Sequence, residues 1–72
     1  MWTGYQFNDD LAAEAKVFLN PSPWGINGGR ISKLNVYRWI SDDWEVFYEY
    51  DRGGVVGDID ADLLARIIAK WN

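Results

Sequence analysis

The chain has 72 residues, of which 11 are acidic and 7 are basic, and it contains no cysteine and no histidine. A chain of this length forms one small domain, residues 1–72, because it buries only about 60% of the surface that its unfolded form exposes. The composition excludes a disulfide, a zinc site built from cysteine and histidine, a cysteine nucleophile and a histidine general base. We therefore expect a protein that is not an enzyme and that holds no cofactor or metal.

Aromatic residues make up 17% of the chain and include five tryptophans. Each large ring buries about 150–250 Å², so a few rings can support a core in so short a chain. A domain of this size has few interior positions, and exposed aromatic clusters often mark interfaces. Two interpretations stay open: most rings lie in the core, or several of them form a contact surface.

Charge is distributed unevenly along the sequence. The segment 42–62 has a net charge of −7, whereas the rest of the chain has a net charge of +3. This distribution argues against direct binding to nucleic acid, which usually requires a basic face, and favours a partner with a basic surface. The absence of a basic, apolar leader and of a long apolar stretch predicts a cytoplasmic protein without a membrane segment.

The first third of the chain predicts two strands. Aromatic residues within 2–7 suggest the first strand, and Asn8, Asp9 and Asp10 suggest a turn. Residues 10–19 have the composition of a helix, but their apolar residues occupy every second position. The alternation favours a second strand near 12–19, and a helix remains the alternative.

A glycine-rich loop follows between Pro21 and Arg30. Gly28 and Gly29 are expected in the left-handed conformation, where a side chain costs about 1–2 kcal/mol. The spacing of the glycines fits neither common phosphate-binding pattern, so a structural turn or a partner-contact loop is favoured. Trp24 is either a core residue or a contact residue, with partial burial favoured, and Arg30 is the better candidate for contact.

The second half predicts a hairpin and a helix. Residues 30–40 and 44–51 have the β-branched and aromatic composition of strands, and the residues between them form a short turn. Residues 50–58 are interpreted as the end of the last strand and a turn that leads into the helix. Residues 60–71 have apolar side chains at helical spacing, with Asp58 or Asp60 as the capping residue.

These elements predict an α+β fold: a four-stranded antiparallel sheet in meander order, covered on one face by one C-terminal helix. The opposite face should leave Tyr37, Trp39 and Phe47 partly exposed. The residues expected in the core are Val17, Leu34, Val36, Val46, Leu64, Ile67, Ile68 and Trp71.

Two segments carry a resemblance to a known family. The stretch from Trp24 to Leu34 contains Gly-Ile-Asn-x-Gly-Arg-Ile-Ser-Lys-Leu, and Tyr-Asp-Arg-Gly follows at 50–53. Together with residues 15–18 and the terminal helix, they resemble a family of small uncharacterised proteins, a domain of unknown function, carried by bacteriophages and other mobile elements. Gly54 and Val55 depart from the family pattern, which has an aromatic and an acidic residue there. The resemblance implies a phage context and supports a strand over 15–19.

The features together predict a small acidic phage-type binding protein that inhibits a host macromolecule, most concretely an anti-CRISPR or other anti-defence inhibitor. Its partner would be a larger host protein or nucleoprotein complex with a basic surface, and a homodimer stays open. The alternatives are a small-ligand or nucleotide-binding protein that uses the glycine loop, and a homo-oligomeric structural protein. The residues expected to contact a partner are Asp42, Asp43, Glu45, Glu49, Trp24, Arg30, Tyr37 and Trp39.

Overall fold

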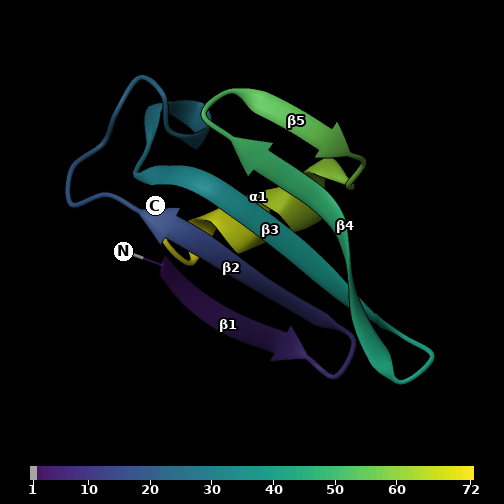
Figure 1. Ribbon diagram of the computed structural model, residues 1–72. Helices are drawn as coiled ribbons and strands as arrows, with labels where there is room; N and C mark the ends of the chain where they lie inside the picture. Colours follow the sequence, from purple (N-terminus) through teal and green to yellow (C-terminus); the bar gives the residue numbers. More distant parts are fainter. Residues whose placement is uncertain (1) are drawn as a thin grey trace.

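A computed structural model describes residues 2–72, which form an antiparallel sheet of five strands in the order β1-β2-β3-β4-β5 and one helix, α1. Figure 1 shows that α1 crosses one face of the sheet, and that the other face carries no second layer. The α+β class, the meander order and the C-terminal helix are confirmed. The elements are β1 Trp2–Asn8, β2 Leu11–Val17, a 3-10 helix Ile26–Gly28, β3 Ile31–Ile40, β4 Asp43–Asp51, β5 Gly54–Gly57 and α1 Ala61–Ala69.

The prediction of four strands is wrong, because residues 54–57 form a fifth strand. Gly54 pairs with Asp51 and Gly57 pairs with Tyr48, so the strand returns antiparallel along β4. The loop between the two strands is Arg52-Gly53, and both residues have positive φ (45° and 97°), as tight two-residue hairpins require. The strand is only four residues long and has glycine at both ends, so its composition resembles that of a turn.

The strand prediction for the first third is confirmed, since β2 spans Leu11–Val17 and pairs with β1 and β3. Ala13 and Ala15 are 3% and 0% exposed, because their small side chains lie under the helix. Between them, Glu14 points to the opposite face. Tertiary packing therefore overrides the helix propensity of an alanine-rich segment.

The core lies between α1 and the face of the sheet that α1 covers. Ile67 and Trp71 pack there with Leu34 and Val36 of β3 and Tyr48 of β4. Asp60 caps the helix, as one of the two predicted alternatives: its carboxylate accepts a hydrogen bond from the Leu63 N–H at 3.0 Å. No helix in the described part of the chain has the length and apolar character to cross a membrane.

Three residues of the expected core are not buried in it. Val17 and Leu64 are only half-buried, at the margin of the cluster. Val46 is 39% exposed, so its assignment to the core is wrong. The cause is a bulge in β4: Val36 pairs with Tyr48 but Tyr37 pairs with Val46, so Phe47 is an extra residue. The bulge turns Val46 to the opposite face from Tyr48, although a regular strand would place both on one face.

Candidate functional site

The face of the sheet that α1 does not cover presents a continuous set of side chains to solvent; we name it the open face. Its members alternate along the strands with the residues beneath the helix, and neighbouring members follow from the strand register. It carries aromatic, charged and amide groups in place of the aliphatic groups of the covered face. Its residues are Trp2, Gly4, Gln6, Ala12, Glu14, Lys16, Lys33, Asn35, Tyr37, Trp39, Trp44, Val46, Glu49, Asp51, Gly54 and Val56.

Two tryptophans form the aromatic part of the open face. Trp39 of β3 and Trp44 of β4 are register partners, and their rings meet edge to face with centroids 5.3 Å apart and planes at 75°. Trp39 is 42% exposed. Edge-to-face pairs fix the ring positions, so this surface is ordered before a partner arrives.

A hydrogen-bonded group lies beside these rings. The Glu14 carboxylate accepts a bond from the Tyr37 hydroxyl at 2.5 Å and one from the Asn35 amide at 3.1 Å. The Tyr37 hydroxyl and the Asn35 amide hold the pKa of Glu14 below its usual value. The Glu14 carboxylate in turn raises the pKa of Tyr37 to about 12, because the phenol proton is held in this bond.

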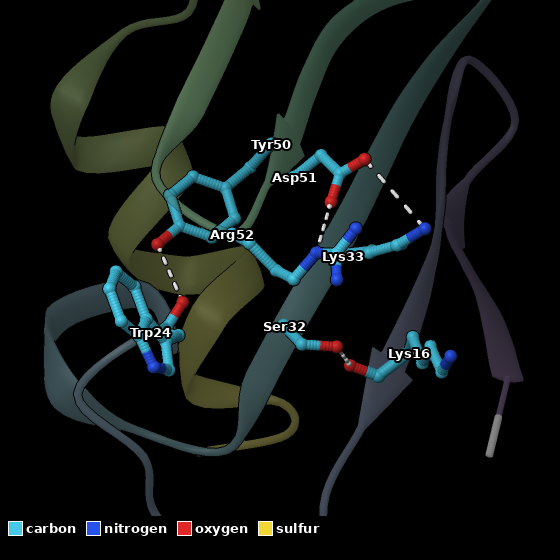
Figure 2. A network of polar contacts seen from close by, with 7 residues as sticks. All are labelled: Lys16, Trp24, Ser32, Lys33, Tyr50, Asp51 and Arg52. Carbon is cyan, nitrogen blue, oxygen red and sulfur yellow. Dashed lines mark hydrogen bonds and ion pairs between the residues drawn. The ribbon is translucent and has the colours of Figure 1, made fainter.

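Figure 2 shows polar contacts at the end of the sheet where β2 and β4 end and β3 begins. Asp51 of β4 is 3.7 Å from the Lys33 ammonium and 3.2 Å from Nε of Arg52. The buried Ser32 hydroxyl donates to the Lys16 carbonyl at 3.3 Å, and so ties β3 to β2. The Tyr50 hydroxyl donates to the Trp24 carbonyl at 3.0 Å and holds the glycine-rich loop against β4.

The open face is hollowed at two places. A hollow of about 280 Å³ lies between Glu14, Tyr37 and Trp44, and one of about 530 Å³ lies between Trp2, Lys33 and Glu49. Both open directly to solvent, whereas the clefts that hold small ligands enclose most of the ligand surface. Within residues 2–72, no three acidic side chains gather closely enough to hold a metal ion.

The predicted contact residues of the β3–β4 hairpin do not all lie on one surface. Tyr37, Trp39 and Glu49 lie together on the open face. Asp42 lies in the turn between β3 and β4, and Asp43 begins β4. Glu45 faces the other side, where its register partner is Arg38.

Trp24 and Arg30 lie apart from this face, in the glycine-rich loop. Trp24 is 67% exposed, so the expectation of a partly buried Trp24 is wrong; Ile26, at 6% exposed, is the loop residue in the core. The Arg30 guanidinium donates to the Trp71 carbonyl at 2.5 Å, and the Arg30 N–H donates to the Asn72 side chain at 3.1 Å. Arg30 therefore holds the end of the chain in place, and its contact with a partner stays a prediction.

The backbone of the loop is already hydrogen-bonded within the molecule. The N–H groups of Ser22, Gly25 and Gly29 donate to carbonyls of the same loop at 2.9 Å. Gly28 has the expected positive φ of 69°, but Gly29, at −94°, does not, and Asn27 takes the second left-handed position at 54°. These amides are turned inward, so the arrangement does not resemble an anion cradle.

Sequence reasoning missed Glu14, Asn35 and Trp44 as members of the site. Glu14 could have been found, since it alternates with the apolar residues Ala13 and Ala15 and so faces away from the core. Trp44 could not, because the bulge at Phe47 reverses the face that simple alternation assigns to it.

The model of a family, the domain of unknown function DUF7678, matches residues 1–70. The chain belongs to this family. Searches of the curated proteins and of the solved structures found no match. Because the family match covers nearly the whole chain, the sheet, the open face and α1 all lie within one DUF7678 domain.

Proposed function

We propose that this DUF7678 protein is a small, non-catalytic binding protein that contacts a basic surface on a larger host macromolecule and thereby inhibits it. The open face and the acidic strand β4 would make the contact. The observation that carries the proposal is the division of the sheet: α1 covers one face, and the other presents ordered aromatic and charged side chains to solvent.

The aromatic residues supply the apolar part of such an interface. Tyr37, Trp39 and Trp44 adjoin one another on the open face, and tryptophan and tyrosine are among the residues that most often dominate binding energies. The hydrogen bond from Tyr37 to Glu14 and the ring contact between Trp39 and Trp44 hold these side chains in place, which lowers the entropy lost on binding.

The acidic residues supply the charge complementarity. Asp43, Glu45, Glu49 and Asp51 all belong to β4, which contains no basic residue, and Asp42 directly precedes it. The neighbouring strand β5 is uncharged, so only Lys33 and Arg38 of β3 offset this charge from the adjacent strands. Glu49 and Asp51 lie on the open face, whereas Asp43 and Glu45 lie on the other side of β4. Exposed carboxylates on a strand of this kind steer a basic partner towards the sheet.

The family resemblance gives the proposal its most specific form. A protein carried by a phage that blocks a basic nucleic-acid channel would act against host defence, as an anti-CRISPR protein does. Binding of a small ligand and a purely structural oligomer are the competing functions, and the experiment below separates them.

The experiment is capture from host lysate with the purified protein as bait. We expect one large partner at a fixed ratio, lost on Trp39→Ala with Trp44→Ala and on Asp43→Lys with Glu49→Lys. The matched controls are Leu19→Ala, which truncates a side chain that is 88% exposed outside the sheet, and Asp9→Lys, which reverses a charge in the β1–β2 turn.

The proposal also predicts how binding depends on salt concentration. Exposed charge pairs are screened over about 8–10 Å at physiological salt, so binding should weaken as salt rises. Capture that is insensitive to salt and to the open-face substitutions, but lost in the controls, would contradict the proposal. Recovery of only further copies of the bait would favour the structural alternative.

A further inference from the structure

The two edges of the sheet differ in how they are protected. β1 and β5 are the outermost strands, so each has one side on which its backbone N–H and C=O groups meet no neighbouring strand within residues 2–72. Natural proteins blunt such edges with charge, proline, bulges or short strands, because an unprotected edge pairs with other chains. β5 is blunted: it has four residues, Gly57 at its end has a φ of 90°, and Asp58 follows.

β1 lacks most of these protections. It has seven residues, Trp-Thr-Gly-Tyr-Gln-Phe-Asn, with no charged residue and no proline. Its pairing with β2 is regular from Trp2 to Gln6, and the irregularity falls only at its end, between Gln6 and Asn8. β1 is therefore the longer and less protected of the two edges.

The end of the helix holds β1 in place without covering its edge. The Lys70 ammonium lies 4.1 Å from the centre of the Tyr5 ring, and the Phe7 ring meets the Trp71 ring edge to face with centroids 6.4 Å apart. These contacts lie on the covered face, whereas the free backbone groups of β1 point sideways in the plane of the sheet. A strand ordered in advance loses little entropy when it pairs.

The distribution of charge makes the β1 edge the one at which a second copy meets the least repulsion. Two copies of a chain with net charge −4 repel each other, and the acidic residues gather on β4. β2 and β3 separate β4 from β1, and β2 itself carries one acidic and one basic residue, Glu14 and Lys16. The edge of β1 is thus a place where two copies approach with weak repulsion.

We propose that β1 pairs with β1 of a second copy, antiparallel about a two-fold axis, so that the two sheets become one. In such a pair β1 faces β1 of the second copy, so charged residues on this strand would lie near like charges. β1 has no charged residue, so this repulsion is absent. The two open faces then lie side by side in one continuous surface, and the contact leaves the residues of the proposed function free.

The experiment is sedimentation equilibrium of the purified full chain over a range of concentrations. The mass should rise from 8.3 kDa towards twice that value as the concentration increases. Gln6→Lys places like charges close together across the two-fold axis and should weaken the dimer by about tenfold or more. Val56→Lys is the matched control, because Val56 is also exposed on the open face but belongs to the opposite edge, and it should leave the dimer unchanged.

A second measurement keeps the test independent of the variants. Hydrogen exchange of the wild-type chain should slow at β1 amides, and not at β5 amides, as the concentration rises. A mass that stays at that of the monomer up to about 1 mM, where association would be worth only ~4 kcal/mol, overturns the proposal. A dimer that resists Gln6→Lys or dissociates on Val56→Lys overturns it as well, because it then uses another surface.

Discussion

The two faces of the sheet consist of alternate residues of the same strands, yet they differ in almost every property. On the covered face, Ala15, Leu34 and Val36 are fully buried under α1. On the open face, their neighbours Glu14, Asn35 and Tyr37 form hydrogen bonds with one another at the surface. The pleat of the strands therefore separates two sets of residues: one face holds the fold together, and the residues of the other are not required for the core.

The largest effect should come from truncating the covered face. Leu34→Ala leaves a cavity in a fully buried position and should cost about 2–5 kcal/mol, enough to unfold much of so small a domain. Trp39→Ala, on the open face, removes a larger side chain but loses mainly the contact with Trp44, worth about 0.5–1.5 kcal/mol. Urea unfolding followed by circular dichroism measures both; equal losses would show that the two faces do not differ as described.

A second large effect is expected in the loop that sends Ile26 into the covered face. A side chain at Gly25 would place its Cβ 2.0 Å from the Gly29 carbonyl oxygen, so Gly25→Ala forces the loop apart and should cost about 3 kcal/mol or more. Gly28→Ala meets no atom within 4 Å and loses only its left-handed conformation, at about 1–2 kcal/mol. Thermal melting of the pair tests the order; a larger loss for Gly28→Ala would contradict it.

The open face should add a pH dependence that the aliphatic residues of the covered face do not. The pKa of Tyr37 is about 12 in the fold and about 10 when unfolded, so this stabilisation is complete below pH 10 and is lost as the pH rises from 10 to 12. The pKa of Glu14 is lowered from 4.5, so its stabilisation is complete above pH 4.5 and is lost as the pH falls below it.

Melting temperatures of two variants, measured across the pH range, test the acid and the alkaline loss of stability. Tyr37→Phe should remove this contribution to the alkaline loss and reduce the acid loss, because the hydroxyl that lowers the Glu14 pKa is gone. Glu14→Gln should remove this contribution to the acid loss and bring the pKa of Tyr37 back towards 10. Profiles of both variants that superimpose on that of the wild type would refute the coupling between these groups.

The smallest effect is expected at the tip of the β3–β4 hairpin. Ser41 and Asp42 have positive φ (49° and 69°), which serine does not favour and which aspartate adopts at a higher cost than glycine. Asn-Gly suits this two-residue turn, so Ser41→Asn with Asp42→Gly should stabilise the protein by about 0.5–1 kcal/mol. The same variant removes one of the predicted contact acids, so a gain in the melting temperature with weaker binding would place Asp42 in the interface.

The sequence was sufficient where local pattern and tertiary structure agree. Alternation in residues 11–19 predicted a strand near 12–19 despite its alanines, and the observed β2 ends two residues earlier, at Val17. The capping aspartate and apolar spacing predicted α1. The sequence was insufficient where one extra residue interrupts the alternation of faces along a strand. The bulge at Phe47 reversed the faces of Val46 and Trp44, and no local signal distinguishes a bulged strand from a regular one.

The candidate site shows the same limit. Tyr37 and Trp39 were predicted on the exposed face because β3 alternates regularly, and the structure places them there. Glu14, which accepts a hydrogen bond from Tyr37, comes from a strand more than twenty residues away in the sequence. That hydrogen bond follows from the register of β2 against β3. That register is a tertiary property, which a local pattern does not contain.

Radical footprinting of the complex captured from lysate would locate the contact surface, because the tryptophans report on separate surfaces. Trp39 lies on the open face at 42% exposed, and Trp24 lies in the loop at 67% exposed. We expect Trp39 and Trp44 to lose most of their oxidation in the complex, while Trp24 oxidises as it does in the free protein. Protection of Trp24 with unchanged oxidation of Trp39 and Trp44 would contradict the account and assign binding to the glycine-rich loop.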